Sequence, residues 1–407
     1  MNAAIHPLPY GSRRARDGEA PEARNFVVRA EKVAKIAEKY AAAVDREARF
    51  PSEAFESMRE QRLLSMLIPA ELGGDGARAS DVADACAILG AACGSTGMIF
   101  AMHHVKVACL VRHDRNNTWL KEFLRDAARD QYLLASSTTE GNNGADIRAS
   151  DAAVKLNKAR VHLDRDASCI SYGAQADAIV TIARRADAAS NSDQVLVVFR
   201  RSDYTLEPTR TWDTLGMRGT CSVGYRLRAE GGAEQVLGEP YERIHNQSMA
   251  PYAHLLWSAT WQGIASAAFR RARAFVRHAS RSSGGRMPPG AQHLSRARIS
   301  LETLRSAIQG GLATFERHAQ EPGGLTSMNA QLSLNFLKVE ASELAVQTVM
   351  QAMRTTGLSG YRNDTDFSMG RYLRDILSSP IMIHNDRVLA NSEAAVLMSE
   401  PPLHIAG

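Results

Sequence analysis

The sequence predicts an α+β fold in which a central β region separates two helical regions. Apolar residues recur with helical spacing before about residue 132 and again after about residue 252, and short β-branched runs fill the stretch between. With 407 residues, of which 44% are hydrophobic and 23% charged, the chain is long enough for several packed units. We expect a flexible tail over residues 1–24, an N-terminal helical domain over 25–132, a central β domain over 133–236 and a C-terminal helical domain over 237–407.

The first helical region opens with an amphipathic helix and continues with buried ones. Four residues follow the i, i+3, i+4, i+7 spacing of one helix face, namely Val33, Ile36, Ala37 and Tyr40. Residues 81–110 are almost all small or apolar. Because helices that are apolar all round lie in the interior, we expect two buried helices here, broken near Gly94.

The middle region has the patterns of a β domain. Residues 178–183 and 195–199 are β-branched runs separated by Gly, Asn, Asp and Ser, and Val161-His-Leu alternates with period two. These patterns predict a small antiparallel sandwich or barrel. Helical patterns then return from residue 255 to 276, from 294 to 318, from 330 to 355 and from 372 onward, which predicts a second helical region.

Composition and charge exclude several classes of protein. The excess of 49 Lys and Arg over 44 Asp and Glu is small and does not cluster with aromatic residues, so we expect no nucleic-acid partner. No apolar stretch is long enough to span a membrane, and five widely spaced cysteines indicate reduced thiols, so we expect a cytoplasmic protein without a membrane partner. We also expect no metal site, since no His-x-x-x-His occurs and adjacent His103 and His104 cannot hold one ion.

Five short motifs occur in a fixed order along the chain. They are LIPAELGGDG at 67–76 with ACGSTG at 92–97, ASSTTEGNNGADI at 135–147, WDTLGMRGTCS at 212–222, RTTGLSGY at 354–361 and RYLRD at 371–375. In this order the motifs resemble those of the acyl-CoA dehydrogenase superfamily over about residues 27–398. The resemblance implies the fold of that superfamily: an N-terminal helical domain, a central antiparallel β domain and a C-terminal four-helix bundle.

The same resemblance implies a flavin cofactor, FAD in a dehydrogenase, with FMN open for a monooxygenase. Seven residues stand where relatives contact the flavin: Ser136, Thr138, Thr139, Ser171, Arg281, Asn385 and Arg387. Hydroxyls on a β loop can bond the ring edge where negative charge gathers on reduction. Alternatives remain, because Ser and Thr also occur in solvated loops and Arg281 could cap a helix. The segment CISYGAQAD at 169–177 also resembles a family motif, with Cys169 in place of the usual Trp.

The catalytic carboxylate that relatives use to remove an α-proton has no counterpart here. The two positions that carry this Glu in the family correspond to Ile383 and Ala253. One explanation is a displaced base, for which His384, Asp386 and His254 are candidates. The other is a monooxygenase that needs no such base, in which His103 or His104, Ser171 and His384 would act on the flavin side.

We therefore expect an FAD-dependent acyl-CoA dehydrogenase-like oxidoreductase. The leading function is α,β-dehydrogenation of an acyl thioester bound to CoA or a carrier protein. The alternative is a two-component, reduced-flavin-dependent monooxygenase that hydroxylates a small molecule, and a third possibility is a non-catalytic flavin or acyl-CoA binding protein. Expected partners are a small-molecule substrate, a second copy of the chain in a dimer or tetramer, and an electron-transfer protein or flavin reductase.

Overall fold

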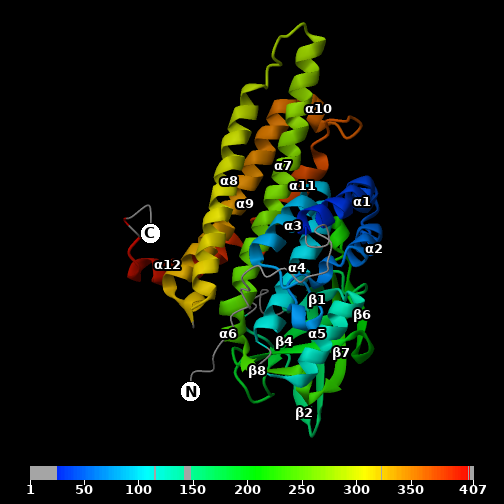
Figure 1. The fold of residues 1–407 in the computed structure, drawn as a ribbon, viewed down its shortest axis with the longest axis vertical. Coiled ribbons are helices and arrows are strands. Elements are labelled where there is room, and N and C mark those ends of the chain that lie inside the picture. Colours follow the sequence, from blue (N-terminus) through cyan, green and yellow to red (C-terminus); the bar gives the residue numbers. More distant parts are fainter. Residues whose placement is uncertain (1–24, 114–115, 142–147, 322, 402, 404–407) are drawn as a thin grey trace.

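A computed structural model describes residues 25–113, 116–141, 148–321, 323–401 and 403, so the tail expected over 1–24 lies outside the described residues. Helical, β and helical regions follow one another along the chain, as predicted, and Figure 1 shows them in sequence colours. None of the described helices is long and apolar enough to cross a membrane.

The first helical region contains the two buried helices that the sequence predicts. Its helices are α1 (Phe26–Glu47), α2 (Ser52–Glu60), α3 (Ala79–Ala92), α4 (Gly94–Arg112) and α5 (Thr118–Asp130). Cys93 has extended backbone and separates α3 from α4. Nearly every residue of α4 is buried, because this helix lies between α3, α7 and the first strand.

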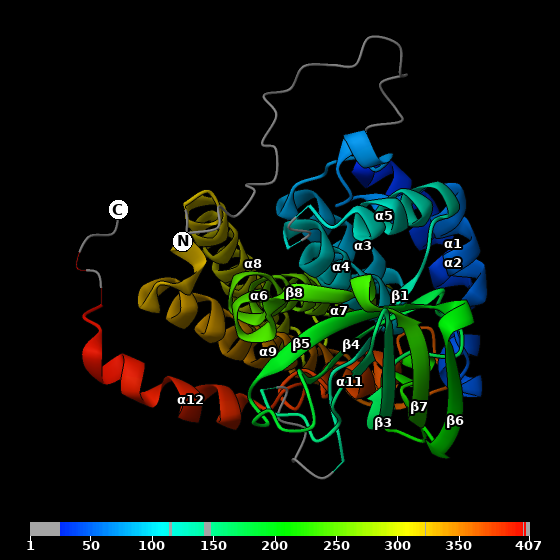
Figure 2. The same ribbon diagram turned by 90° about the horizontal axis from the view of Figure 1, so that it is seen from below.

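The β region forms two four-stranded sheets. One has the order β1 (Leu134–Ser137), β4 (Ala178–Arg184), β5 (Gln194–Arg200), β8 (Val236–Pro240); the other has the order β2 (Lys155–Asn157), β3 (Arg160–Ile170), β7 (Val223–Gly232), β6 (Tyr204–Arg210). The pairs are antiparallel except β1 with β4, which the prediction of an antiparallel domain did not include. Parallel pairing needs a long connection, and residues 138–177 provide it. Seen from below in Figure 2, the strands lie together on one side of α4 and α5.

The C-terminal region is built on three long helices. The chain leaves β8 through α6 (Tyr241–Ile244) and a π-helical turn (His245–Met249) into α7 (Ala250–Ser282), α8 (Gln292–Ala319) and α9 (Met328–Thr356). The fourth helix of the predicted bundle is interrupted: α10 (Leu358–Tyr361) and α11 (Gly370–Ile376) are short, and residues 377–384 separate α11 from α12 (Asn385–Met398). Pro380 and two residues with left-handed backbone, Ile383 (φ 49°) and His384 (φ 43°), explain why one helix cannot continue.

Helix α11 ties the three regions together. The Asp375 carboxylate accepts a hydrogen bond from the Met217 backbone N–H at 2.7 Å, in the loop between β6 and β7. Arg374 forms an ion pair with Asp45 at the end of α1, and the Asp45 carbonyl accepts a bond from Arg218 at 2.8 Å. Burial raises the pKa of Asp375 to about 6. The motif at 371–375 therefore joins α1, the second sheet and the C-terminal helices.

A glycine in α7 permits close packing against α3, which provides a test of this interface. A Cβ at Gly263 would lie 2.1 Å from the Ala87 carbonyl oxygen, so Gly263→Ala should lower the free energy of unfolding by about 1–3 kcal/mol. Gly310 in α8 is the matched control, because it is exposed and a Cβ there meets nothing within 4 Å. Gly310→Ala should raise the free energy of unfolding by about 1 kcal/mol through helix propensity. Urea denaturation of both variants measures the difference, and equal effects would contradict the interface.

Candidate active site

A cavity of about 380 Å³ lies where the β region, α4 and the C-terminal region meet. It has a strand wall of Ser136, Thr138, Thr139, Cys169, Ser171, Trp212, Met217, Thr220 and Ser222. It has a helical wall of Met98, Met102, Val105, Lys106, Met249 and Trp257. Residues 378 and 381–383, from the break between α11 and α12, close it.

The strand wall brings together four of the predicted flavin-binding residues, Ser136, Thr138, Thr139 and Ser171. Two of these residues bond neighbouring hydroxyls, and the Ser171 oxygen lies 2.7 Å from the Ser222 oxygen. Thr139 accepts a bond from Ser168 at 2.8 Å. Such a row of hydroxyls can offer several hydrogen bonds to one edge of a planar polar ring.

A buried ion pair fixes the loop that carries Thr138 and Thr139. Glu140, the next residue, lies 3.2 Å from Arg165 of β3, and its carboxylate also accepts bonds from the backbone N–H groups of Asp151 and Ala152. Both side chains are almost completely buried. Because removing one member would leave a buried charge unpaired, this pair holds the loop against the second sheet.

The apolar lining has one charged side chain. Lys106 of α4 is 1% exposed, and its ammonium lies 3.1 Å from the Met249 sulfur. Burial lowers the pKa of Lys106 to about 8. Met249 ends the π-helical turn, a feature that occurs frequently at functional sites.

Ile383 and Ala253, the two positions where the family resemblance places a catalytic Glu, line adjoining cavities. Ile383 lines the main cavity, and Ala253 lines an adjoining cavity of about 300 Å³. The two cavities share Met249, Trp257 and Ile383. Among the described residues, neither cavity is lined by Asp or Glu, and the main cavity is lined by no His.

The candidates near the C-terminus do not come together at the cavity. His384 and Asp386 are exposed and line neither cavity. Asn385 is buried in the helical region, where its side-chain oxygen accepts a bond from Lys338 at 2.6 Å. Arg387 lines the adjoining cavity.

The histidines of the helices are bonded to backbone groups. His103 Nε2 donates to the Leu64 carbonyl at 2.7 Å and its Nδ1 accepts from the Leu134 N–H at 3.0 Å, while His104 bonds the Leu63 carbonyl at 3.0 Å. Both are buried and line neither cavity, so these bonds favour a structural role. His254 lines the adjoining cavity, but its side chain is hydrogen-bonded to the Leu334 carbonyl. Burial, and to a smaller extent the positive charge of Lys338, lowers the pKa of His254 to about 3.

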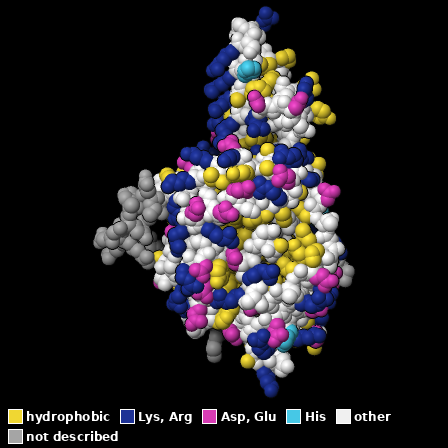
Figure 3. Space-filling model, turned by 90° about the vertical axis from the view of Figure 1, so that its right-hand side faces the viewer, with side chains coloured by type: hydrophobic (Ala, Val, Ile, Leu, Met, Phe, Trp, Pro, Cys, Tyr) yellow, Lys and Arg dark blue, Asp and Glu magenta, His cyan; other side chains and the backbone are white. Residues whose placement is uncertain are grey.

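Arg281 is far from the cavity of its own subunit. It is exposed at the end of α7, where α7 and α8 project beyond the other elements (Figure 1). Trp257 lies 24 residues earlier in the same helix, which corresponds to roughly 36 Å along the helix axis. Basic side chains run along one edge of this projection in Figure 3.

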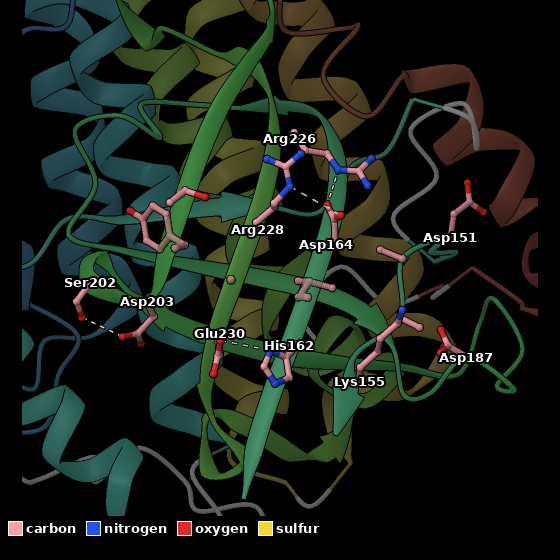
Figure 4. A pocket seen from close by; sticks show the side chains of 16 residues that line it. Asp151, Lys155, His162, Asp164, Asp187, Ser202, Asp203, Arg226, Arg228 and Glu230 are labelled. Atoms are coloured by element: carbon pink, nitrogen blue, oxygen red, sulfur yellow. Dashed lines mark hydrogen bonds and ion pairs between the residues drawn. The ribbon is translucent and has the colours of Figure 1, made fainter. Parts of the chain in front are cut away.

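A larger hollow of about 640 Å³ lies on the outer face of the second sheet (Figure 4). Its charged side chains bond one another: Arg226 pairs with Asp164, His162 lies 3.5 Å from Glu230, and Ser202 donates to Asp203 at 2.9 Å. These bonds across and beside the strands describe a solvated, salt-bridged sheet surface. The main cavity, of about 380 Å³, is the candidate active site.

The fold and the cavity define a class of protein. The model of the acyl-CoA dehydrogenase N-terminal domain matches residues 21–131, and that of the C-terminal domain matches residues 249–396. The chain belongs to the acyl-CoA dehydrogenase superfamily, which confirms the predicted family and fold. Membership also supports the prediction of a flavin, FAD or FMN, as cofactor.

Individual relatives carry different names within this superfamily. The chain is 24% identical over 337 residues to the probable acyl-CoA dehydrogenase YngJ of Bacillus subtilis, covering 82% of this chain and 86% of the relative. It is also 24% identical to the amino sugar nitrososynthase DnmZ of Streptomyces peucetius, covering 83% and 84%. The crystal structure of FMN-bound TdsC from Paenibacillus sp. A11-2 superposes with a TM-score of 0.81 at 18% identity, covering 93% and 98%.

Sequence reasoning missed Lys106, Met249 and Trp257. A signal for Lys106 was present, since it is a charged residue in the middle of a helix that is predicted to be buried. Met249 and Trp257 gave no such signal, because large apolar residues at the start of a helix are ordinary core residues.

The bonds of His103 predict a pH effect on stability. Burial lowers the pKa of His103 from 6.5 to about 4, so the unfolded chain takes up the proton first as the pH falls. The contribution of neutral His103 to the free energy of unfolding is fully present above pH 6.5 and is lost toward pH 4. At pH 5 about 2 kcal/mol of it is lost. His103→Gln can keep both hydrogen bonds without titrating, so its free energy of unfolding should fall less between pH 7 and pH 5. Denaturant titrations at both pH values measure this, and equal losses in both proteins would contradict it.

Proposed function

We propose that the protein is a flavin-dependent oxidoreductase that uses reduced flavin and O2 to oxygenate a small molecule. The observation that carries the proposal is the lining of the main cavity, which has hydroxyls on the strand wall and no described carboxylate or imidazole. Removal of an α-proton from an acyl thioester requires a positioned base. Oxygenation by a reduced flavin does not require that base, and this favours the alternative of the sequence-based prediction over dehydrogenation.

The residues of the cavity fit a flavin ring. Ser136, Thr138, Thr139 and Ser171 would hold its polar edge, with Trp212 beside them on the same wall. A bound flavin supplies the redox chemistry. The chain contributes the hydrogen bonds that orient the ring and an apolar helical wall that keeps water from the reacting atoms.

The relatives support a two-component system. DnmZ is named as an amino sugar nitrososynthase, and TdsC, whose fold this chain shares, was crystallised with FMN. Reduced flavin would come from a separate reductase, which is the partner we propose. We also propose a homo-oligomer, in which exposed Arg281 would act at a neighbouring subunit and not in its own cavity.

Dehydrogenation of an acyl thioester is the second candidate. The helical wall favours it, because Met98, Met102 and Val105 offer a flexible apolar surface that suits an acyl chain. YngJ, named as a probable acyl-CoA dehydrogenase, is a relative of similar length. This candidate lacks an obvious base, because His384 and Asp386 lie outside the cavity.

One pair of assays separates the two candidates. Under anaerobic conditions, a panel of acyl-CoA thioesters should leave the absorbance of the flavin-loaded protein unchanged. With a flavin reductase, NADH and O2, a panel of aromatic and amino-substituted substrates should yield oxygenated product, detected by mass spectrometry. Bleaching by an acyl-CoA without a reductase would favour dehydrogenation and overturn the proposal.

Loss of a hydroxyl from the strand wall should weaken flavin binding. Ser171→Ala removes one hydrogen bond, worth about 1 kcal/mol, so the Kd for flavin should rise about fivefold. Fluorescence titration with FMN and with FAD measures it. Ser202→Ala is the matched control, because Ser202 lies on the outer sheet surface of Figure 4 and its loss should leave the Kd unchanged. Equal affinities in Ser171→Ala and the unaltered protein would remove Ser171 from the flavin site.

A further inference from the structure

Lys106 is a buried cation that forms no ion pair with a described residue. It is 1% exposed, and its one hydrogen-bond partner among those residues is the Met249 sulfur at 3.1 Å. A thioether is a weak acceptor and carries no charge. A buried charge of this kind is costly unless a partner compensates it.

The groups around Lys106 supply no negative charge. Cys109, one turn along α4, is buried, and burial raises its pKa to about 11, so its thiol is neutral. Arg112, six residues further along α4, donates to Ser248 at 3.1 Å. Glu239 lies further along and already pairs with His113 at 2.9 Å and with Arg243 at 2.7 Å.

Because Lys106 lines the cavity, a ligand bound there can supply the negative charge that compensates the ammonium. Lys106 belongs to the helical wall with Met98, Met102 and Trp257, whereas the hydroxyls belong to the strand wall. The indole Nε1 of Trp257 is also buried without a partner among the described residues. The helical wall thus offers a cation in apolar surroundings, which suits a ligand that is largely apolar and has one anionic group.

We infer that Lys106 is a specificity residue that binds a carboxylate on the substrate, so that the enzyme acts on small apolar carboxylic acids. This role deepens the proposed function and rests on it, because the strand wall is taken to hold the flavin and the helical wall the substrate. In a site shielded from water, the ammonium–carboxylate pair gains more than it would at the surface. A neutral analogue would leave the ammonium uncompensated, so the site should discriminate strongly against it.

Binding of matched acid and amide pairs tests this role. We would measure Kd values of benzoate against benzamide and of octanoate against octanamide by calorimetry, with the flavin-loaded protein. Each acid should bind at least tenfold more tightly than its amide. Lys106→Met, which keeps the length and apolar character of the side chain, should abolish the preference, and Lys106→Arg, which keeps the charge, should retain it. Lys32→Met, at an exposed position of α1, is the control and should bind as the unaltered protein does.

A melting curve shows whether the charge lacks a partner in the free protein. Lys106→Met should melt at a higher temperature than the unaltered protein, since it removes a buried charge without leaving a polar group behind. Acids should raise the melting temperature of the unaltered protein more than they raise that of the variant. A variant that melts lower without ligand, or equal binding of acids and amides by the unaltered protein, would overturn the inference.

Flavin titrations separate this inference from the proposed function. Lys106→Met should bind FMN and FAD with unchanged Kd. If the variant loses flavin affinity, the cation serves the flavin, and the assignment to substrate is overturned. If the unaltered protein binds neither flavin but still prefers acids, the proposed function fails while Lys106 remains the anion-binding residue.

Discussion

The arrangement of this protein depends on the bond between Asp375 and the backbone of Met217. A short helix of the C-terminal region supplies the carboxylate, and the loop between β6 and β7 of the second sheet supplies the N–H. Arg374 and Asp45 bring α1 to the same point. Gly216 packs so closely there that a Cβ would lie 2.1 Å from the Arg374 carbonyl oxygen. This junction holds the start of β7, and with it part of the strand wall, against the C-terminal region.

The interruption after α11 begins two residues after Asp375 and closes one side of the cavity. Residues 377–384 turn the chain before α12, which packs on α9. The turn places Ile381, Met382 and Ile383 over the strand wall. Left-handed backbone at Ile383 and His384 directs His384 outward, to the start of α12. A uniform fourth helix would place a different set of side chains at the cavity.

The sequence predicted what depends on periodicity and on short-range pattern. It predicted the paired buried helices α3 and α4 and the β runs, because 3.6-residue and two-residue periods are local properties. The hydroxyls of the strand wall were predicted from motifs that resemble those of the family. It did not predict the break after Ile376, so His384 and Asp386 were expected at a position that the fold turns outward. The choice between structural and catalytic roles for His103 also needed the fold, since its partners Leu64 and Leu134 lie far away in sequence. The role of Arg281 depends on a second subunit and stays a prediction.

The motifs that identify the family are mainly structural, which is why they leave the reaction open. Arg374 and Asp375 hold regions together, and Glu140 anchors a loop, so the fold itself requires them. Ile383 and Ala253 have no such structural role, so a change of side chain at either position alters the chemistry of the cavities while the fold remains. Lys106 shows the opposite pattern, because a buried charge without an ion-pair partner in the described part of the chain weakens the folded state and contributes nothing to the packing that a methionine would not. A residue with that cost and a place in the cavity is best explained by the ligand, so the reaction of this protein has to be argued from the walls of the cavity and not from its motifs.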